Sequence, residues 1–276
     1  MDNSADTFLY HYTTIEKLAL ILKNKTIRLM PLDKLDDVQE AKTKDSENLG
    51  KYVFVSSWTE DETESIPMWN LYSDLTCGVR IGLRKNPFKW HATKESDFLK
   101  LNKEDADETT LIKEINTFLD LEPLILNHIF CPQARTGDIL KKVEYTNDLE
   151  KLEPQIIKQE EKRITLELGK LGCVKNQYWE FQKEWRYVIQ FFRWPIADNL
   201  QITQEKATKE FGRTKIGSDE RIFDYYDLEI DEKAFDEMII TPSPKMTPGN
   251  KVLLESIIEK YNQKAKVIES QLTNLL

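Results

Sequence analysis

The segment from Trp179 to Phe192 constrains the fold of this 276-residue chain more than any other. Its second half, residues 187–192, is a mostly apolar run with the length of a buried strand, and such a strand needs partners in a sheet. Its first half, residues 179–186, sets two carboxylates, an amide and a guanidinium among aromatic rings. Burying such groups costs free energy, so they are expected to be paired with one another or to take part in binding or catalysis. The sequence therefore predicts that the chain's chemistry lies here.

Strand-like segments occur on both sides of a charged middle. Before it we expect strands at 8–12, 27–30, 52–56 and 77–83, and after it at 186–192, 223–228, 238–241 and 266–269. They do not alternate regularly with helices. This pattern predicts a single α+β domain over residues 1–276 with a mainly antiparallel central sheet.

The helical segments differ in character along the chain. Thr13 and Glu16 form a capping box that predicts a helix ending near Asn24, and we expect further helices at 68–72 and 251–261. Residues 91–171 contain long charged stretches, such as 109–119 and 151–169, and predict a helical insertion. Residues 204–221 are polar and punctuated by glycine, which is typical of a surface loop.

Composition excludes several classes of protein. The chain has 39 basic and 48 acidic residues, a net charge of −9, which argues against broad binding to a phosphate backbone. Its three cysteines match neither a metal knuckle nor a disulfide framework, and we expect core thiols in a reducing compartment. Three scattered histidines give no metal-ligand spacing. The polar N-terminus leads into no apolar run of signal or membrane-spanning length, so we expect a cytoplasmic protein that binds neither membrane nor metal.

Six short motifs occur together and in order: LYHYT at 9–13, ILKNKTIR at 21–28, LDDVQE at 35–40, FVSSW at 54–58, MWNLY at 68–72 and KEWR at 183–186. Together they resemble the bacterial family of unknown function DUF2971. The chain departs from the family at 36–40, where relatives usually show Asn-Asp-Pro-Phe-Glu. Asp37 and Glu40 nevertheless keep their places.

That family in turn resembles the ADP-ribosyltransferase fold, in which a histidine, a serine and a glutamate on separate strands complete the site. The resemblance implies His11 for the first position, Ser56 or Ser57 for the second and Glu184 for the third. Gln182 then gives a Gln-x-Glu pattern. The implied substrate is NAD, whose cleavage needs no metal.

These residue types suit that chemistry. Breaking the bond between nicotinamide and ribose builds positive charge on the ribose, which a fixed carboxylate such as Glu184 would stabilise. His11 can donate a hydrogen bond to a ribose hydroxyl, Tyr12 or Tyr72 can stack on nicotinamide, and Ser56 would brace the glutamate. The residues we assign to catalysis are Glu184 and Gln182, and those we assign to nucleotide binding are His11, Tyr12, Ser56, Ser57, Trp69, Tyr72 and Arg186.

Structural roles remain open for the same residues. His11 could be a hydrogen-bonded histidine at a strand end, and Glu184 with Arg186 could form a structural ion pair. The acidic loop with Asp36, Asp37 and Glu40 is expected to be solvated rather than to bind a cation. The three tryptophans expected in the core or in a pocket wall are Trp69, Trp179 and Trp185.

Two functions from different classes follow. The first is an NAD-consuming ADP-ribosyltransferase or NAD glycohydrolase, acting as a toxin or in defence against phage. The second is a non-catalytic module that binds a nucleotide or another small ligand on the same scaffold, or that has kept the scaffold for a protein partner. The enzyme requires His11, Ser56 and Glu184 to converge on one cleft. The sequence does not identify a macromolecular target.

Overall fold

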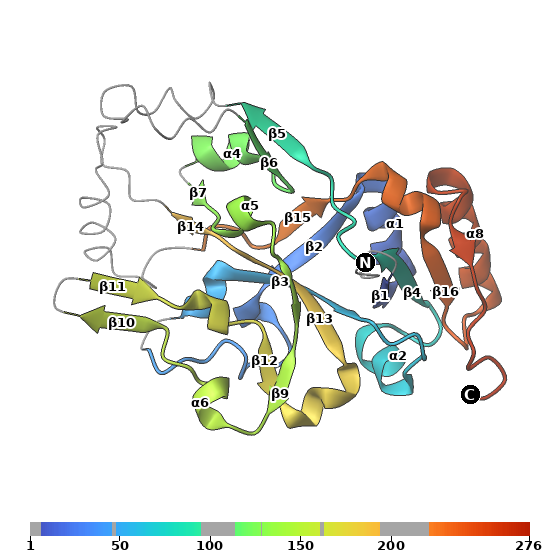
Figure 1. Ribbon diagram of the computed structural model, residues 1–276. Helices are drawn as coiled ribbons and strands as arrows, with labels where there is room; N and C mark the ends of the chain where they lie inside the picture. The colour runs from blue at the N-terminus through green and yellow to red at the C-terminus, as the bar shows by residue number, and fades with distance from the viewer. Residues whose placement is uncertain (1–6, 46–47, 95–113, 128, 161–162, 194–220) are drawn as a thin grey trace.

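The computed structural model describes residues 7–45, 48–94, 114–127, 129–160, 163–193 and 221–276. Its centre is a nine-stranded sheet in which every pairing is antiparallel except that of β16 with β17 (Figure 1). This architecture confirms the predicted α+β class. The strands of the sheet are β1 (Phe8–Thr14), β2 (Thr26–Pro31), β3 (Val53–Thr59), β4 (Gly78–Arg84), β8 (Leu140–Lys142), β13 (Glu184–Gln190), β15 (Tyr226–Glu229), β16 (Ile239–Pro242) and β17 (Lys266–Val267).

The sheet forks at β3. Strand β13 runs along one edge of β3 over its whole length. Two strands share the other edge of β3. Strand β2 pairs with the beginning of β3, where Met30 lies opposite Val55, and β1 pairs with the end of β3, where Tyr10 lies opposite Thr59. The end of β3, the beginning of β13 and the part of β1 around Tyr10 therefore meet at one place.

Both faces of β13 are covered, which explains the apolar run in its sequence. Tyr187 and Ile189 belong to a large core with residues of α1, whereas Val188 packs with Val55 in a smaller core on the other face. Successive side chains of a strand point to opposite faces. A strand with both faces buried has no alternation of polar and apolar residues.

The first two helices of the fold both contact β1. Helix α1 (Ile15–Asn24) contacts α8 (Pro248–Tyr261), and Figure 1 shows the two side by side. Helix α2 (Ile66–Tyr72) begins at Ser65, whose hydroxyl accepts a hydrogen bond from the Met68 amide. The predicted cap at Thr13 is wrong by one residue. Thr14 caps α1, because Thr13 is still paired within β1.

The prediction of a helical insertion over 91–171 is wrong for the described part of that block. Residues 157–160 and 163–166 pair as antiparallel strands instead of forming the predicted helix, and 114–117 form a strand, because pairing outweighs the helix propensity of charged residues. Strand β8 even joins the central sheet beside β13. The strands outside that sheet are β5 (His91–Lys94), β6 (Glu114–Thr117), β7 (Ile129–Phe130), β9 (Glu144–Thr146), β10 (Ile157–Glu160), β11 (Arg163–Leu166), β12 (Val174–Asn176) and β14 (Phe192–Arg193).

The remaining helices are short. They are α4 (Leu121–Leu126), α5 (Gln133–Thr136) and α6 (Leu149–Leu152), with 3₁₀ helices η2 (Leu32–Lys34), η3 (Leu49–Tyr52), η4 (Leu168–Lys170), η5 (Gln177–Gln182) and η6 (Glu232–Glu237). No helix of the described residues is long and apolar enough to cross a membrane. Most of the predicted loop at 204–221 lies outside the described residues. The cysteines are free thiols, and of the three only Cys131 is fully buried.

Candidate functional site

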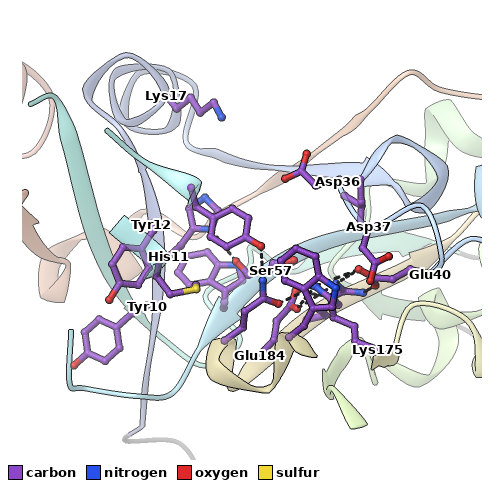
Figure 2. Close-up of a pocket in the computed structure, with 17 residues that line it drawn as sticks. Tyr10, His11, Tyr12, Lys17, Asp36, Asp37, Glu40, Ser57, Lys175 and Glu184 are labelled. Atoms are coloured by element: carbon purple, nitrogen blue, oxygen red, sulfur yellow. Dashed lines mark hydrogen bonds and ion pairs between the residues drawn. The ribbon is translucent and has the colours of Figure 1, made fainter. Parts of the chain in front are cut away.

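A pocket of about 170 Å³ lies where β1, β3 and β13 meet, and residues of α2, η5 and the 35–40 loop complete its wall. Figure 2 shows Glu40, Lys175 and Glu184 joined by interactions on one side and Tyr10 and Tyr12 on the other. Seven of the nine residues predicted for the site line this pocket, namely His11, Tyr12, Ser57, Tyr72, Gln182, Glu184 and Arg186.

Strand register decides which serine reaches the pocket. Ser57 lies opposite Arg186, and Glu184 is two residues away on the same face of β13. The Ser57 hydroxyl hydrogen-bonds to Glu184. Ser56 lies opposite Tyr187 on the other face, where its Oγ accepts a hydrogen bond from Trp58 Nε1 at 3.1 Å. Ser57 therefore takes the bracing role expected of Ser56.

Arg186 is the centre of a buried group of four charges, and its side chain is only 1% exposed. Its Nε donates to Glu184 Oε1 at 2.6 Å, and its Nη1 and Nη2 both donate to Glu40. The ammonium of Lys175 lies 3.1 Å from Glu184 Oε2 and 3.2 Å from Glu40 Oε1. Two carboxylates thus face two cations, and we call these four residues the charge quartet. The quartet is neutral as a whole, which reduces the free-energy cost of burying it.

Glu184 is held as a carboxylate within the quartet. Burial alone would raise its pKa, but the charges of Arg186 and Lys175 outweigh that effect and the pKa is lowered. Its backbone amide is fixed by a 2.8 Å hydrogen bond to the hydroxyl of Tyr145. The side chain is therefore ionised at neutral pH and well positioned, but it is poorly suited to act as a general base.

His11 is oriented by the backbone of β3. Its Nδ1 lies 2.8 Å from the carbonyl oxygen of Ser57, and its ring packs against Trp58 with centroids 5.1 Å apart. Burial lowers the pKa of His11, so the ring is neutral at pH 7. A carbonyl can only accept, so Nδ1 carries the proton and Nε2 is left as an acceptor. A ribose hydroxyl would then donate to His11, which reverses the direction expected from the sequence.

Trp69 lies behind the pocket wall rather than in it. Its ring is completely buried and meets Tyr12 edge-on with centroids 4.9 Å apart. Its Nε1 donates a 2.9 Å hydrogen bond to Glu64. Tyr12 is held in turn by Arg80 and by the Ser65 amide, which donates to its hydroxyl at 3.0 Å. Trp69 supports a residue of the pocket and does not contact its interior.

The comparison with known families bears on part of this site. A family described as "Protein of unknown function (DUF2971)" matches residues 68–187. This region belongs to DUF2971. The matched region includes Tyr72, Lys175 and Glu184, whereas His11 and Ser57 precede it. No curated protein matches the chain.

Two members of the charge quartet lie outside the set of residues predicted for the site. Glu40 was expected on a solvated acidic loop, but it is buried against Arg186 and Lys175. The available signal was its place in the motif at 35–40, which is one of the six motifs that resemble DUF2971 in the sequence. No sequence signal distinguishes Lys175, because it is one lysine of a short strand in a highly charged chain. The other pocket residues outside the predicted site are Tyr10, Lys17, Leu35, Asp36, Asp37, Trp58, Met68 and Trp179.

The described residues give little support for a metal centre. Among them, no three His, Cys, Asp or Glu side chains are grouped so that they could hold a metal ion. Two carboxylates of the pocket, Glu40 and Glu184, already face Arg186 and Lys175. Their charge is thus balanced by the protein itself.

Proposed function

We propose that this DUF2971 protein consumes NAD by cleaving the bond between nicotinamide and ribose, as an ADP-ribosyltransferase or an NAD glycohydrolase. The observation that carries the proposal is the arrangement of His11, Ser57 and Glu184 around one pocket, although they come from three separate strands. A neutral histidine, a bracing hydroxyl and a permanent carboxylate are the groups that such a reaction needs.

In the proposed reaction the electron pair of the bond between nicotinamide N1 and ribose C1′ leaves with nicotinamide. Positive charge develops on the ribose until a nucleophile, water or an acceptor group, forms a bond to C1′ and releases its proton. Glu184 would stabilise this charge as a carboxylate, and His11 Nε2 would accept a hydrogen bond from a ribose hydroxyl. The rings of Tyr12 and Trp179 line the same pocket and offer surfaces for stacking.

A second candidate is a non-catalytic module that binds a nucleotide in the same pocket. The observation that favours it is the position of both Glu184 oxygens, which already lie within 3.2 Å of Arg186 or Lys175 nitrogens. Those cations reduce the negative field that a cationic ribose would experience. The two candidates thus differ in whether Glu184 acts on a ligand or only within the quartet.

Release of nicotinamide from NAD by the purified protein separates the two candidates. For the enzyme we expect release by the wild type and a fall of at least about 100-fold in Glu184→Gln, as when one oxyanion-hole donor is removed. Because Glu184→Gln also disturbs the quartet, His11→Asn serves as a second variant that changes no charge. Glu180→Gln, at an exposed position of η5, is the matched control. Binding of NAD without release by the wild type would favour the module.

An NAD-consuming activity would act in cells as a toxin or in defence against phage. We expect the wild-type chain, expressed in bacteria, to lower cellular NAD and arrest growth, and Glu184→Gln to do neither. Equal growth arrest by a stably folded Glu184→Gln protein would refute the proposed role of this carboxylate.

A further inference from the structure

We propose that the Tyr72 hydroxyl donates a hydrogen bond to an uncharged acceptor of the ligand, such as a carboxamide carbonyl, and that Lys175 and Gln182 fix the direction of this bond. The inference rests on the proposed function in one respect only. If the ligand is NAD, the acceptor is the carboxamide of its nicotinamide. The direction of the hydrogen bonds follows from the residues themselves.

The chain of hydrogen bonds begins at Lys175, which is almost fully buried. Its ammonium has three hydrogens and no lone pair, so every contact that it makes is a donation. It lies 2.8 Å from Gln182 Oε1, 3.1 Å from Glu184 Oε2 and 3.2 Å from Glu40 Oε1. Three acceptors thus match its three hydrogens. The oxygen of the Gln182 amide must therefore face Lys175.

The orientation of Gln182 then determines the role of Tyr72. With its oxygen toward Lys175, the Gln182 amide presents its nitrogen to Tyr72 and donates to the hydroxyl oxygen. The hydroxyl hydrogen cannot point back at that nitrogen, since an amide nitrogen does not accept. Among the described residues, none accepts a hydrogen bond from Tyr72, whose side chain lines the pocket. The hydrogen is thus available to a ligand.

The surroundings of Tyr72 select the charge of that ligand group. Burial, followed by the nearby carboxylates of Glu184, Asp36 and Glu40, outweighs the opposing charge of Arg186 and raises the pKa of Tyr72 to about 12, so the hydroxyl keeps its proton at neutral pH. The same carboxylates disfavour a negatively charged acceptor. A carboxamide suits the position, whereas a carboxylate of the same shape does not.

Binding of small aromatic probes measured by calorimetry tests this inference without NAD. We expect nicotinamide and benzamide to bind the wild type at least about tenfold more tightly than nicotinate and benzoate. Tyr72→Phe removes the donor and should weaken amide binding about tenfold. Gln182→Glu should weaken it at least as much, because a carboxylate there accepts from both Lys175 and Tyr72 and draws the hydroxyl hydrogen inward.

Matched controls are Tyr178→Phe and Gln263→Glu, which make the same chemical changes at exposed positions. Melting temperatures of all variants show whether they are folded. If Gln182→Glu does not fold, the amide affinity of Tyr72→Phe alone tests the inference. Failure of the amides to bind, equal binding of amides and acids, or unchanged amide affinity in Tyr72→Phe would overturn the inference. Amide binding with the expected losses, but without NAD cleavage, would support it while refuting the proposed enzyme.

Discussion

Ser57 and Arg186 lie opposite each other in the antiparallel register of β3 and β13. This pairing puts Ser57 on the face of the sheet that carries Glu184 and leaves Ser56 on the other face, opposite Tyr187. A shift of one residue in the register would exchange the two serines. The composition of the pocket therefore depends on the exact pairing of two strands that are far apart in sequence.

The two serines should respond differently to removal of their hydroxyls. Ser56→Ala leaves the buried Nε1 of Trp58 without its acceptor and should lower the free energy of unfolding by about 1–3 kcal/mol. Ser57→Ala should leave stability nearly unchanged but raise the pKa of Glu184, because its hydroxyl helps to lower that pKa. Denaturant unfolding and carboxyl NMR titration measure the two effects. A larger change in the Glu184 pKa from Ser56→Ala would contradict the assignment.

The charge quartet should be sensitive to the loss of one carboxylate. Glu40→Gln leaves Arg186 and Lys175 with a single buried counter-charge, and we expect a loss on the order of 3 kcal/mol in the free energy of unfolding. Adding Lys175→Met removes the excess cation and should restore part of that loss.

Asp36→Asn is the control for this cycle, because Asp36 is exposed and should change stability by no more than about 0.5 kcal/mol. Urea denaturation of the single and double variants gives the coupling free energy between Glu40 and Lys175. Strictly additive effects would mean that the two residues do not act as one group.

Much of the fold could be predicted because apolar patterns mark buried strands. The alternation of Val79, Ile81 and Leu83 predicted β4, and the apolar run after Arg186 predicted β13. The prediction for the charged middle is wrong because helix propensity is a weak guide to structure, even for good helix formers such as Lys and Glu, and pairing between β10 and β11 outweighs it. Local sequence does not contain this tertiary contribution.

The site was also partly predictable, because the period of a strand places some of its residues side by side. Glu184 and Arg186 are two residues apart on one strand, so their proximity follows from the period of a strand. Glu40 lies 146 residues from Arg186 in the sequence, and only the folded chain brings the two together. Lys175 reaches Glu184 from another short strand, β12, that has no distinctive pattern.

Stability should depend on pH through His11. Because burial lowers its folded pKa below the unfolded value of about 6.5, the unfolded chain binds more protons between the two values. The contribution of His11 is therefore fully present above about pH 6.5 and declines as the pH falls toward the folded pKa, by at most about 1.4 kcal/mol per pH unit. The lowered pKa of Glu184 affects stability only below about pH 4.3, the pKa of its unfolded state. The contributions of His11 and Glu184 to the pH dependence therefore fall in different pH ranges.

Melting temperatures of the wild type and His11→Asn between pH 5.5 and 7.5 test this dependence. We expect the variant to lose part of the slope, since asparagine can still donate to the Ser57 carbonyl but does not titrate. The difference in melting temperature between the two proteins at pH 7.5 gives the effect of the replacement itself, apart from titration. Parallel curves for the two proteins would show that His11 titrates alike in the folded and unfolded states.

The C-terminal segment should stabilise the pocket through Glu64. This buried carboxylate accepts hydrogen bonds from Trp69 Nε1 at 2.9 Å, Ser270 Oγ at 2.6 Å and the Gln271 amide at 2.6 Å. Trp69 belongs to α2, the helix that also carries Tyr72 into the pocket wall. Removal of residues 270–276 leaves the carboxylate with one of these three donors. We therefore expect a loss on the order of 3 kcal/mol in the free energy of unfolding, because hydrogen bonds to a charged group contribute about 1.5–3 kcal/mol each.

A shorter truncation provides the control for this effect. Removal of residues 273–276 keeps Ser270 and Gln271 and should change the free energy of unfolding by no more than about 0.5 kcal/mol. Ser270→Ala, which removes one donor, should fall between the two truncations. Denaturant unfolding of the three proteins gives this order, and benzamide affinity reports on the pocket. If the two truncations were equally stable, Glu64 would not depend on the C-terminal segment, and α2 would be held in place by Tyr12 and Ser65 instead.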